Sequence, residues 1–393
     1  MNIWLRNPFI IFITLFLLFS CTKKDPYSCI SCHRGLHPGL VSDFENSKMS
    51  DHFSCEKCHG IKHSSKKDVS KTVLPVTATC QNCHEEKADQ YLNGKHSIAF
   101  KAIESLPFTH NQPNAFIKGR KGCGGCHSAG FDKISDRYEK NSLKPKYGMG
   151  CINCHTRHMF SKKEAQEPES CKTCHTGFDH AQYEMWSGSK HGSIYLSNRA
   201  KGMDTKRVPK CQTCHMVNGN HNVITSWGFF GVRAFEKDQR WANDREVIFK
   251  SLGFIDSEGK KTDFYNKAVK LKMIRTDESE FNKIRNSMVR TCSKCHSKSF
   301  VMNNFKNTEE MMREADKLLA QAIREITIKE KEIPKMFSFY DVNTIYQEVL
   351  FNMFMDHRMK SFQAGFHMNP DYSTWYGYAK MKQDLIKIKE SLK

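Results

Sequence analysis

The feature that most constrains this chain is a five-residue motif, Cys-x-x-Cys-His, which occurs eight times. Sixteen of the 17 cysteines fall into these units. The motif is the attachment signature of c-type haem: two thiols form thioethers with the haem, and the adjacent histidine binds the iron. Zinc and redox sites also use Cys-x-x-Cys, but eight copies with every histidine in place favour haem over zinc. The units are Cys29-Cys32-His33, Cys55-Cys58-His59, Cys80-Cys83-His84, Cys123-Cys126-His127, Cys151-Cys154-His155, Cys171-Cys174-His175, Cys211-Cys214-His215 and Cys292-Cys295-His296.

Haem groups at this density replace much of an ordinary hydrophobic core. Seven of the motifs lie between residues 29 and 215, and the hydrophobic fraction of the 393 residues is only 39%. We therefore expect eight c-type haems to supply the apolar interior, wrapped by short helices and loops. No β-rich segment is predicted, and residues 119–130 and 257–266 are expected to be loops.

The pattern changes to long helices after the last motif. Residues 307–333 begin with an Asn or Thr cap and two acidic residues, keep apolar residues at a helical period, and precede Pro334. Further helices are predicted over roughly 341–365 and from about Tyr376. The predicted fold class is therefore mainly α, a multihaem cytochrome c with a haem-packed N-terminal part and long C-terminal helices. The expected domains are a lipoprotein signal peptide over 1–20, an octahaem-binding domain over 21–296 and a helical region over 297–393.

The N-terminus is typical of a bacterial export signal. A single Arg6 precedes an apolar run that ends in LFSC, a sequence similar to a lipobox although Phe19 is atypical at its position. The expected product is a chain lipidated at Cys21 and anchored to a bacterial membrane. The alternatives are plain cleavage near Ser20 or an uncleaved anchor. All three predict an exported protein on the periplasmic side, where c-type haems are assembled.

The formal charge of +19 taken alone would suggest a nucleic-acid partner. A ferric c-type haem with two imidazole ligands carries about −1, because its two propionates outweigh the charge of the iron–porphyrin core. Eight haems would therefore lower the total to roughly +10 or +11. Much of the lysine and arginine excess is then paired with propionates, and no nucleic-acid partner is predicted.

Eleven histidines lie outside the motifs and are candidates for the second axial position of a haem iron. A pure electron conductor would use eight of them, whereas an enzyme would use seven and leave one iron open. His96 and His191 each follow an aromatic helix by one turn, and His158 follows His155 by three residues, on one side of a predicted helical turn. The distal candidates are His37, His52, His63, His96, His110, His158, His191 and His221.

Two later histidines, His357 and His367, lie far from the motifs, and packing or surface positions are predicted for them. The pair Asp179-His180 begins four residues after His175, the last residue of the sixth motif. It fits either of two interpretations, a helix cap beside a ligand or a proton-handling pair. An imidazole titrates near neutral pH, and a carboxylate can hold its tautomer and stabilise its charged form.

The motif spacing, seven clustered and one late, resembles that of the octahaem hydroxylamine oxidoreductases. The resemblance covers nearly the whole chain after the signal. It is also carried by four longer phrases, GCINCHTRHMFS, CKTCHTGFDHAQYEMW, CQTCHMVNGNHNV and HRMKSFQAGFHMNPDYSTWYGY. The resemblance implies that the fourth haem, at Cys123, Cys126 and His127, is catalytic and has no second protein ligand. It also implies that Asp179-His180 stands above the open face of that haem.

Family members that oxidise hydroxylamine bind a tyrosine covalently to the catalytic haem, donated by a neighbouring subunit of a homotrimer. The resemblance makes Tyr372 and Tyr376 candidates for this position, with Tyr378 nearby. Relatives without the crosslink reduce nitrite or hydroxylamine toward ammonium, so the direction stays open here. The expected electron partner is a quinone-linked or soluble c-type cytochrome. The alternative functions are a non-catalytic multihaem conduit and an octahaem reductase of a sulfur oxyanion.

Overall fold

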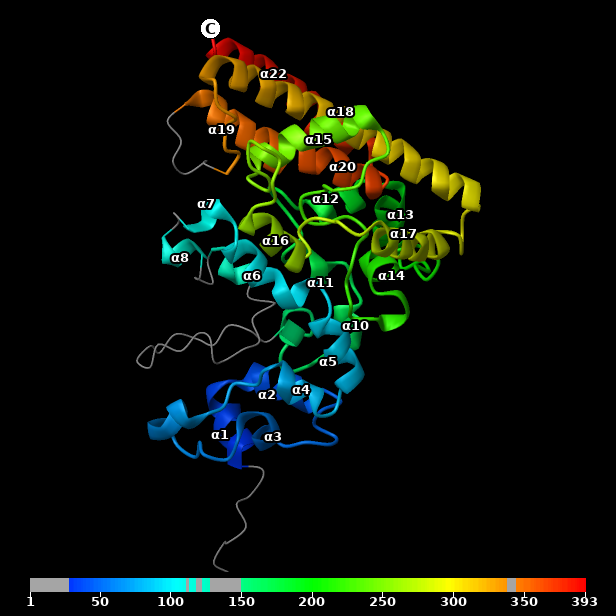
Figure 1. Cartoon of the computed structure of the whole chain (residues 1–393). Coiled ribbons are helices and arrows are strands. Elements are labelled where there is room, and N and C mark those ends of the chain that lie inside the picture. Colours follow the sequence, from blue (N-terminus) through cyan, green and yellow to red (C-terminus); the bar gives the residue numbers. More distant parts are fainter. Residues whose placement is uncertain (1–27, 111–112, 118–121, 128–149, 338–343) are drawn as a thin grey trace, which may run out of the picture. The chain divides into compact units, whose positions relative to one another are not determined.

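The computed structural model describes residues 28–110, 113–117, 122–127, 150–337 and 344–393 (Figure 1). Almost all regular structure in these ranges is helical. Strand-like pairing within them consists of two isolated bridges, Arg233 with Arg275 and Ile255 with Lys261. The prediction of a mainly α fold is confirmed. None of the helices in these ranges has the length and apolar character needed to cross a bilayer. The export signal and Cys21 lie outside the described residues.

Residues 28–74 and 157–160 belong to one compact unit, which contains the first two motifs. The helices are short, and Val41 is buried while most other side chains are half-buried or exposed. A chain this thinly packed has little hydrophobic core of its own. The unit contains α1 (Ser28–Leu36), α2 (Pro38–Glu45), α3 (Cys55–His59) and the 3₁₀-helix η1 (Lys66–Lys71).

The second unit comprises residues 75–156 and 161–393. Its motif-bearing half again consists mostly of short elements. In chain order these are α4 (Thr77–Gln81), α5 (Glu85–Leu92), η2 (His96–Ile98), α6 (Ala99–Glu104), α7 (Pro107–His110), α8 (Asn114–Ile117), α9 (Gly124–His127), η5 (Gly150–Asn153), α10 (Lys162–Ala165), α11 (Glu169–Lys172), α12 (Gln182–Ser187), α13 (Lys190–Ala200), α14 (Cys211–His215) and η6 (Val217–Gly219).

Longer helices follow and pack together in the upper part of Figure 1. The 33-residue α18 lies alongside α15, α20 and α22, and its Leu319, Ile323 and Ile326 are fully buried in the main hydrophobic core. The helices are α15 (Gln239–Ser251), α16 (Asp263–Lys270), α17 (Glu278–Cys292), α18 (Lys298–Glu330), α19 (Ile345–Asn352), α20 (Met359–Phe366), α21 (Pro370–Tyr372) and α22 (Ala379–Ser391), with π-helical turns η8 (Met353–Arg358) and η9 (Ser373–Tyr378).

Four predicted boundaries were wrong, one of them at residues 124–127, which form the short helix α9 inside the predicted loop. The long helix begins at Lys298, nine residues before the predicted start, because Ser297 caps it by accepting a hydrogen bond from the Phe300 amide. Residues 263–266 are helical rather than looped, because Thr262 caps α16 in the same way. The last helical segment begins at Pro370, where proline occupies the first helical position.

A buried ion cluster holds the long helices together. Asp316 of α18 is fully buried and accepts hydrogen bonds from Trp241 Nε1 at 2.7 Å and Arg245 Nε at 3.0 Å, both on α15. Arg358 Nε donates to the same carboxylate at 2.6 Å, and its other nitrogens bind the carbonyls of Phe230 and residue 231. Glu236 also pairs with Arg245, so the buried guanidinium groups of Arg245 and Arg358 face two buried carboxylates.

Candidate haem and catalytic site

Six of the eight attachment histidines lie opposite another histidine at a nearly constant separation. Two imidazoles on opposite faces of one iron would have ring centroids roughly 6 Å apart, because each metal–nitrogen bond is about 2 Å and each half-ring adds about 1 Å. Six pairs match this separation: His33–His63 at 6.1 Å, His59–His158 at 6.0 Å, His175–His96 at 6.0 Å, His155–His221 at 6.3 Å, His215–His367 at 6.2 Å and His296–His191 at 6.0 Å.

The other ring nitrogen of several of these histidines is held by a hydrogen-bond acceptor. His59 Nδ1 lies 3.0 Å from the Val73 carbonyl, and His221 Nδ1 lies 2.9 Å from the carbonyl of residue 219. A carbonyl only accepts, so Nδ1 carries the proton and Nε2 is left free for a metal. Burial lowers the pKa of His96 to about 4 and of His215 to about 3, which keeps both imidazoles neutral, as iron ligation requires.

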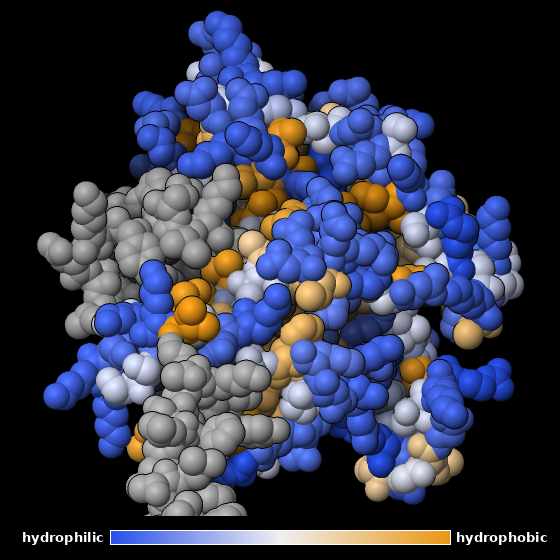
Figure 2. All heavy atoms as spheres, turned by 90° about the horizontal axis from the view of Figure 1, so that it is seen from below, coloured by the Kyte–Doolittle hydropathy of each residue, from blue (hydrophilic) through white to orange (hydrophobic). Residues whose placement is uncertain are grey.

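Exposed apolar side chains near the motifs also fit bound haem. Leu36 and Ile61, which follow the first two motifs within three residues, are 46% and 62% exposed. Figure 2 shows one face of the protein, on which apolar patches lie between hydrophilic side chains. Within the described residues, no group of three or more His, Cys, Asp or Glu side chains is arranged to hold a metal ion. The six facing pairs of histidines match the arrangement in which two imidazoles bind one haem iron.

Five of the eight predicted distal candidates face an attachment histidine: His63, His96, His158, His191 and His221. Their ligation remains a prediction that this geometry supports. The expected helical turn at His155 and His158 is wrong, because both lie in non-helical turns, yet each faces a different histidine.

The other three predicted distal candidates do not belong to the six facing pairs. His37 lies 5.7 Å from His33, beside the closer-matching His63. The ring of His52 packs on Phe53. The side chain of His110 lies outside the described residues.

One facing histidine, His367, lies outside the predicted distal candidates. The predicted packing position is wrong, because the His367 ring lies 6.2 Å from that of His215, and its Nδ1 donates to the Gln363 carbonyl at 2.7 Å. The usable signal was its place in the phrase HRMKSFQAGFHMNPDYSTWYGY, which the resemblance had already singled out. His357, the other late histidine, is instead bound through Nδ1 to Asp384 at 2.5 Å, which agrees with a packing position.

Asp179 and His180 lie in the turn between the sixth motif and α12. Gly177, with φ at +90°, makes this turn possible. The Asp179 carboxylate accepts a hydrogen bond from His180 Nδ1, and the His180 ring lies 6.4 Å from His127 and 6.3 Å from His175. The pair thus stands between the fourth and sixth motifs. The side chains are 17% and 30% exposed, so the pair is shielded but reachable by water.

The separation between His180 and His127 is close to that of the facing pairs, so distance alone allows either a ligand or a distal base. Two groups act on the His180 ring, the Asp179 carboxylate at Nδ1 and the Cys174 backbone. Burial lowers the pKa of His180, but the Asp179 carboxylate and that backbone group outweigh it. The pKa of His180 is therefore raised above its usual value, which favours a proton-carrying imidazole.

The two candidate tyrosines lie on α21 and η9 and stack on each other with centroids 4.7 Å apart. Tyr372 is half-buried and packs against Ala181 and Met185, directly after the Asp179-His180 turn. Burial raises the pKa of Tyr372 above its usual value, as does the nearby Glu184. Tyr376 is 54% exposed. Tyr372 therefore borders the candidate site of its own chain, whereas Tyr376 is open to solvent.

Thiols of different motifs lie close to one another. Cys171 of the sixth motif and Cys211 of the seventh are within hydrogen-bonding reach, and so are Cys174 of the sixth and Cys126 of the fourth. Groups attached at these positions would meet at their edges. The sixth motif is thus the point at which the fourth and seventh come together.

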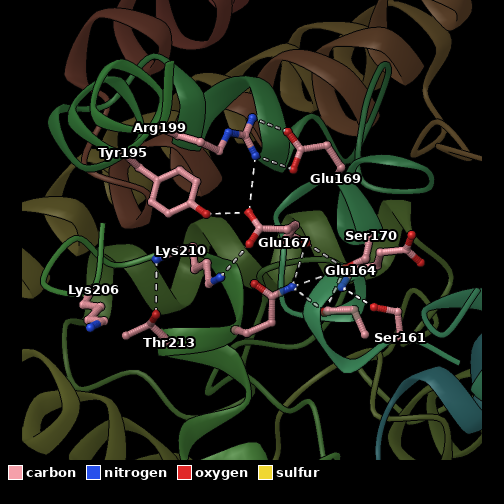
Figure 3. A network of polar contacts seen from close by, with 12 residues as sticks. Ser161, Glu164, Glu167, Glu169, Ser170, Tyr195, Arg199, Lys206, Lys210 and Thr213 are labelled. Atoms are coloured by element: carbon pink, nitrogen blue, oxygen red, sulfur yellow. Dashed lines mark hydrogen bonds and ion pairs between the residues drawn. The ribbon is translucent and has the colours of Figure 1, made fainter. Parts of the chain in front are cut away.

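A polar network fixes this junction (Figure 3). Glu167 accepts from Tyr195 at 2.5 Å and from Lys210 and Arg199 at 3.3 Å, while Arg199 also pairs with Glu169. The contacts join the segment before the sixth motif to α13 and to the residue before the seventh motif. They are partly exposed, so their main effect is to hold these segments in register.

Comparison with known proteins agrees with this geometry. Residues 143–252 match the family model described as seven times multi-haem cytochrome CxxCH, and residues 79–156 match that of cytochrome c554 and c-prime. Two solved structures share the fold. One is the Kuenenia stuttgartiensis reducing HAO-like protein complex Kustc0457/Kustc0458, with a TM-score of 0.69 at 21% identity over 93% of this chain and 84% of that one. The other, a hypothetical multiheme protein, has a TM-score of 0.67 at 19% identity over 94% of this chain and 95% of that one.

A curated relative is the probable nitrite reductase-hydroxylamine oxidoreductase fusion protein of Kuenenia stuttgartiensis. It is 27% identical over 336 residues, which cover 71% of this chain and 35% of the relative. The chain thus spans about a third of that relative's length. The motifs, facing histidines and helical fold define the chain as a multihaem c-type cytochrome. Within that class it is similar to hydroxylamine oxidoreductase-like multihaem proteins, among them the two Kuenenia stuttgartiensis proteins named above.

Proposed function

We propose that this chain is an exported octahaem cytochrome that catalyses multi-electron redox chemistry on a small nitrogen compound, either nitrite or hydroxylamine. The observation that carries the proposal is the position of Asp179-His180, a hydrogen-bonded proton-handling pair beside His127 of the fourth motif. The family relationship supports the reaction class, because one relative is described as a probable nitrite reductase-hydroxylamine oxidoreductase fusion.

A haem at the fourth motif would supply electrons and a binding position for the nitrogen compound. The residues of the chain would handle the protons. Asp179 holds the proton of His180 on Nδ1 and stabilises the charged imidazole. The raised pKa favours the protonated form of His180, and reduction of the nitrogen compound consumes protons. In the oxidation direction the same imidazole would accept protons. The partial exposure of the pair lets it exchange them with solvent.

The remaining seven haems would carry electrons between this site and an outside partner. The facing histidine pairs support six-coordinate, electron-transferring positions. The thiol contacts support a route from the fourth motif through the sixth to the seventh. A soluble or quinone-linked c-type cytochrome is the proposed partner. Lipid anchoring at Cys21, a periplasmic location and a homotrimer belong to the same proposal and rest on the sequence and the resemblance.

The direct test is turnover by the purified holoprotein in both directions. Reduced viologen with nitrite or hydroxylamine tests reduction, and hydroxylamine with an oxidised c-type cytochrome tests oxidation. Mass mapping of haem peptides for a tyrosine adduct at Tyr372 or Tyr376 adds an independent indicator, since the adduct accompanies oxidation in the family. No turnover in either direction would refute the enzyme and favour the electron conduit. Turnover with sulfite alone would favour the sulfur-oxyanion alternative.

A further inference from the structure

Two glutamine side chains form a continuous hydrogen-bonded relay between the sixth motif and the Asp179 backbone. His175 Nδ1 lies 3.0 Å from Gln182 Oε1, and Gln182 Nε2 donates to Gln363 Oε1 at 2.8 Å. Gln363 Nε2 then donates to the Asp179 carbonyl oxygen at 3.2 Å. Gln182 opens α12 and Gln363 lies on α20, so the relay joins segments that are 181 residues apart in the sequence.

The far end of the relay fixes its direction. The Asp179 carbonyl can only accept, so Gln363 must present its NH₂ group there and its oxygen to Gln182. Gln182 then presents its NH₂ to Gln363 and its oxygen to His175. Turning either amide over would bring two oxygens face to face in a site where Gln363 is only 9% exposed. His175 Nδ1 must therefore be the donor, and its Nε2 lone pair is left for iron.

At other attachment histidines a backbone carbonyl accepts the hydrogen bond from Nδ1 directly. Ala99 does so at His127 and Val73 at His59. At His175 the acceptor is a side-chain amide, which is itself polarised by a second amide. Gln363 also serves the neighbouring seventh motif, because its backbone carbonyl accepts from His367 Nδ1. Gln363 thus supports a histidine of each of two facing pairs, His175 through Gln182 and His367 directly. It also binds the turn that carries Asp179.

We infer that Gln182 and Gln363 are positioning residues that set the tautomer and basicity of His175, and thereby the reduction potential of the haem at the sixth motif. A stronger acceptor at Nδ1 makes the imidazole more electron-rich and stabilises ferric over ferrous iron, whereas loss of the acceptor does the reverse. The same relay anchors the Asp179 carbonyl, and this last element alone rests on the proposed function.

The test compares substitutions of opposite chemistry at one position, in the holoprotein. Gln182→Leu removes the acceptor, and Gln182→Glu replaces it with a carboxylate. A tenfold change in the ferric-to-ferrous preference corresponds to about 59 mV for one electron, and outer-shell changes typically alter metal affinity by about 10–100-fold. We expect the potential of one low-spin haem to rise in Gln182→Leu and to fall in Gln182→Glu, followed by potentiometric titration with EPR detection. Gln363→Leu should produce a smaller rise, because Gln182 can still accept but loses its fixed orientation.

The exposed Gln239, which bonds only the Asn243 side chain on the surface of α15, provides the matched control, and Gln239→Leu should leave all potentials unchanged. Haem content by mass and the low-spin absorption bands establish that each variant is assembled. Unchanged potentials, or shifts of the same sign in Gln182→Leu and Gln182→Glu, would overturn the inference. Opposite shifts in a protein without nitrite or hydroxylamine turnover would sustain the relay and refute the proposed function. Turnover of nitrite or hydroxylamine with unchanged potentials in both Gln182 variants would support the proposed function and refute the relay.

Discussion

Replacing His180 with alanine removes the proposed proton carrier while leaving every attachment motif intact. A positioned general acid or base contributes roughly 10²–10⁴-fold to rate, which is about 2.7–5.4 kcal/mol of activation free energy at about 1.36 kcal/mol per tenfold. Most of the His180 side chain is shielded and its Nδ1 is fixed by Asp179, so solvent water is a poor replacement. We therefore expect turnover of His180→Ala to fall at least a hundredfold.

Asp179→Asn is a milder variant, with a smaller expected loss of turnover than His180→Ala. The asparagine carbonyl can still accept from His180 Nδ1, so the tautomer is kept and only the charge is lost. Charge-assisted hydrogen bonds are roughly twice as strong as neutral ones, a difference of about 1–1.5 kcal/mol, or roughly tenfold in rate. The assay is viologen-linked reduction of nitrite and hydroxylamine at saturating substrate, with haem content and EPR spectra recorded for each variant. Full activity in His180→Ala would refute the reasoning. A low-spin haem that becomes high-spin in that variant would instead identify His180 as an iron ligand.

Three further outcomes follow from the described contacts. His191→Ala should convert one low-spin haem to high-spin by EPR with its covalent attachment kept. His357→Ala should leave the spin states unchanged, because no attachment histidine faces His357 within the described residues. Asp316→Asn should lower the free energy of unfolding by about 3–5 kcal/mol in thermal or denaturant unfolding, since the buried Arg358 loses its counter-charge and Arg245 keeps only Glu236. Desolvation raises the pKa of Asp316, but Arg358 and Arg245 outweigh it and depress the pKa. Its contribution should therefore be present above about pH 4, the unfolded value, and disappear as pH falls through the lower folded value, a dependence that Asp316→Asn should lose.

Two results would contradict these predictions. Unchanged spin states in His191→Ala would show that the eighth motif uses another ligand. An Asp316→Asn variant as stable as the wild type would show that the buried ion cluster contributes nothing net to folding, as is known for some buried ion pairs.

The helical class and the attachment chemistry could be predicted from the sequence because both depend on residues that are close together along the chain. Five residues specify each motif, and a 3.6-residue period specifies each helix. The predicted start of the long helix at Asn307 rests on the helical period, whereas the Ser297 cap that begins α18 lies ten residues earlier. The composition of residues 263–266 predicts a loop, although Thr262 caps a helix there.

The facing histidines could be predicted only in part, because the pairing depends on contacts far apart along the chain. His96 faces His175, 79 residues later, and His215 faces His367, 152 residues later. No local pattern encodes such a distance. His367 was therefore assigned to packing, while its phrase was recognised for its resemblance. The Gln182–Gln363 relay has no sequence signature at all, since each glutamine has a function only once α12 and α20 are side by side.

The central claim is that one iron, at the fourth motif, has an open face beside His180. EPR spectroscopy of the fully ferric wild-type protein, with and without cyanide, tests it most directly. The account predicts one high-spin haem whose signal disappears on cyanide binding and shifts with nitrite, while the signals of the other haems stay low-spin and unchanged. A spectrum in which every haem is low-spin and inert to both ligands would contradict the account and leave an electron conduit.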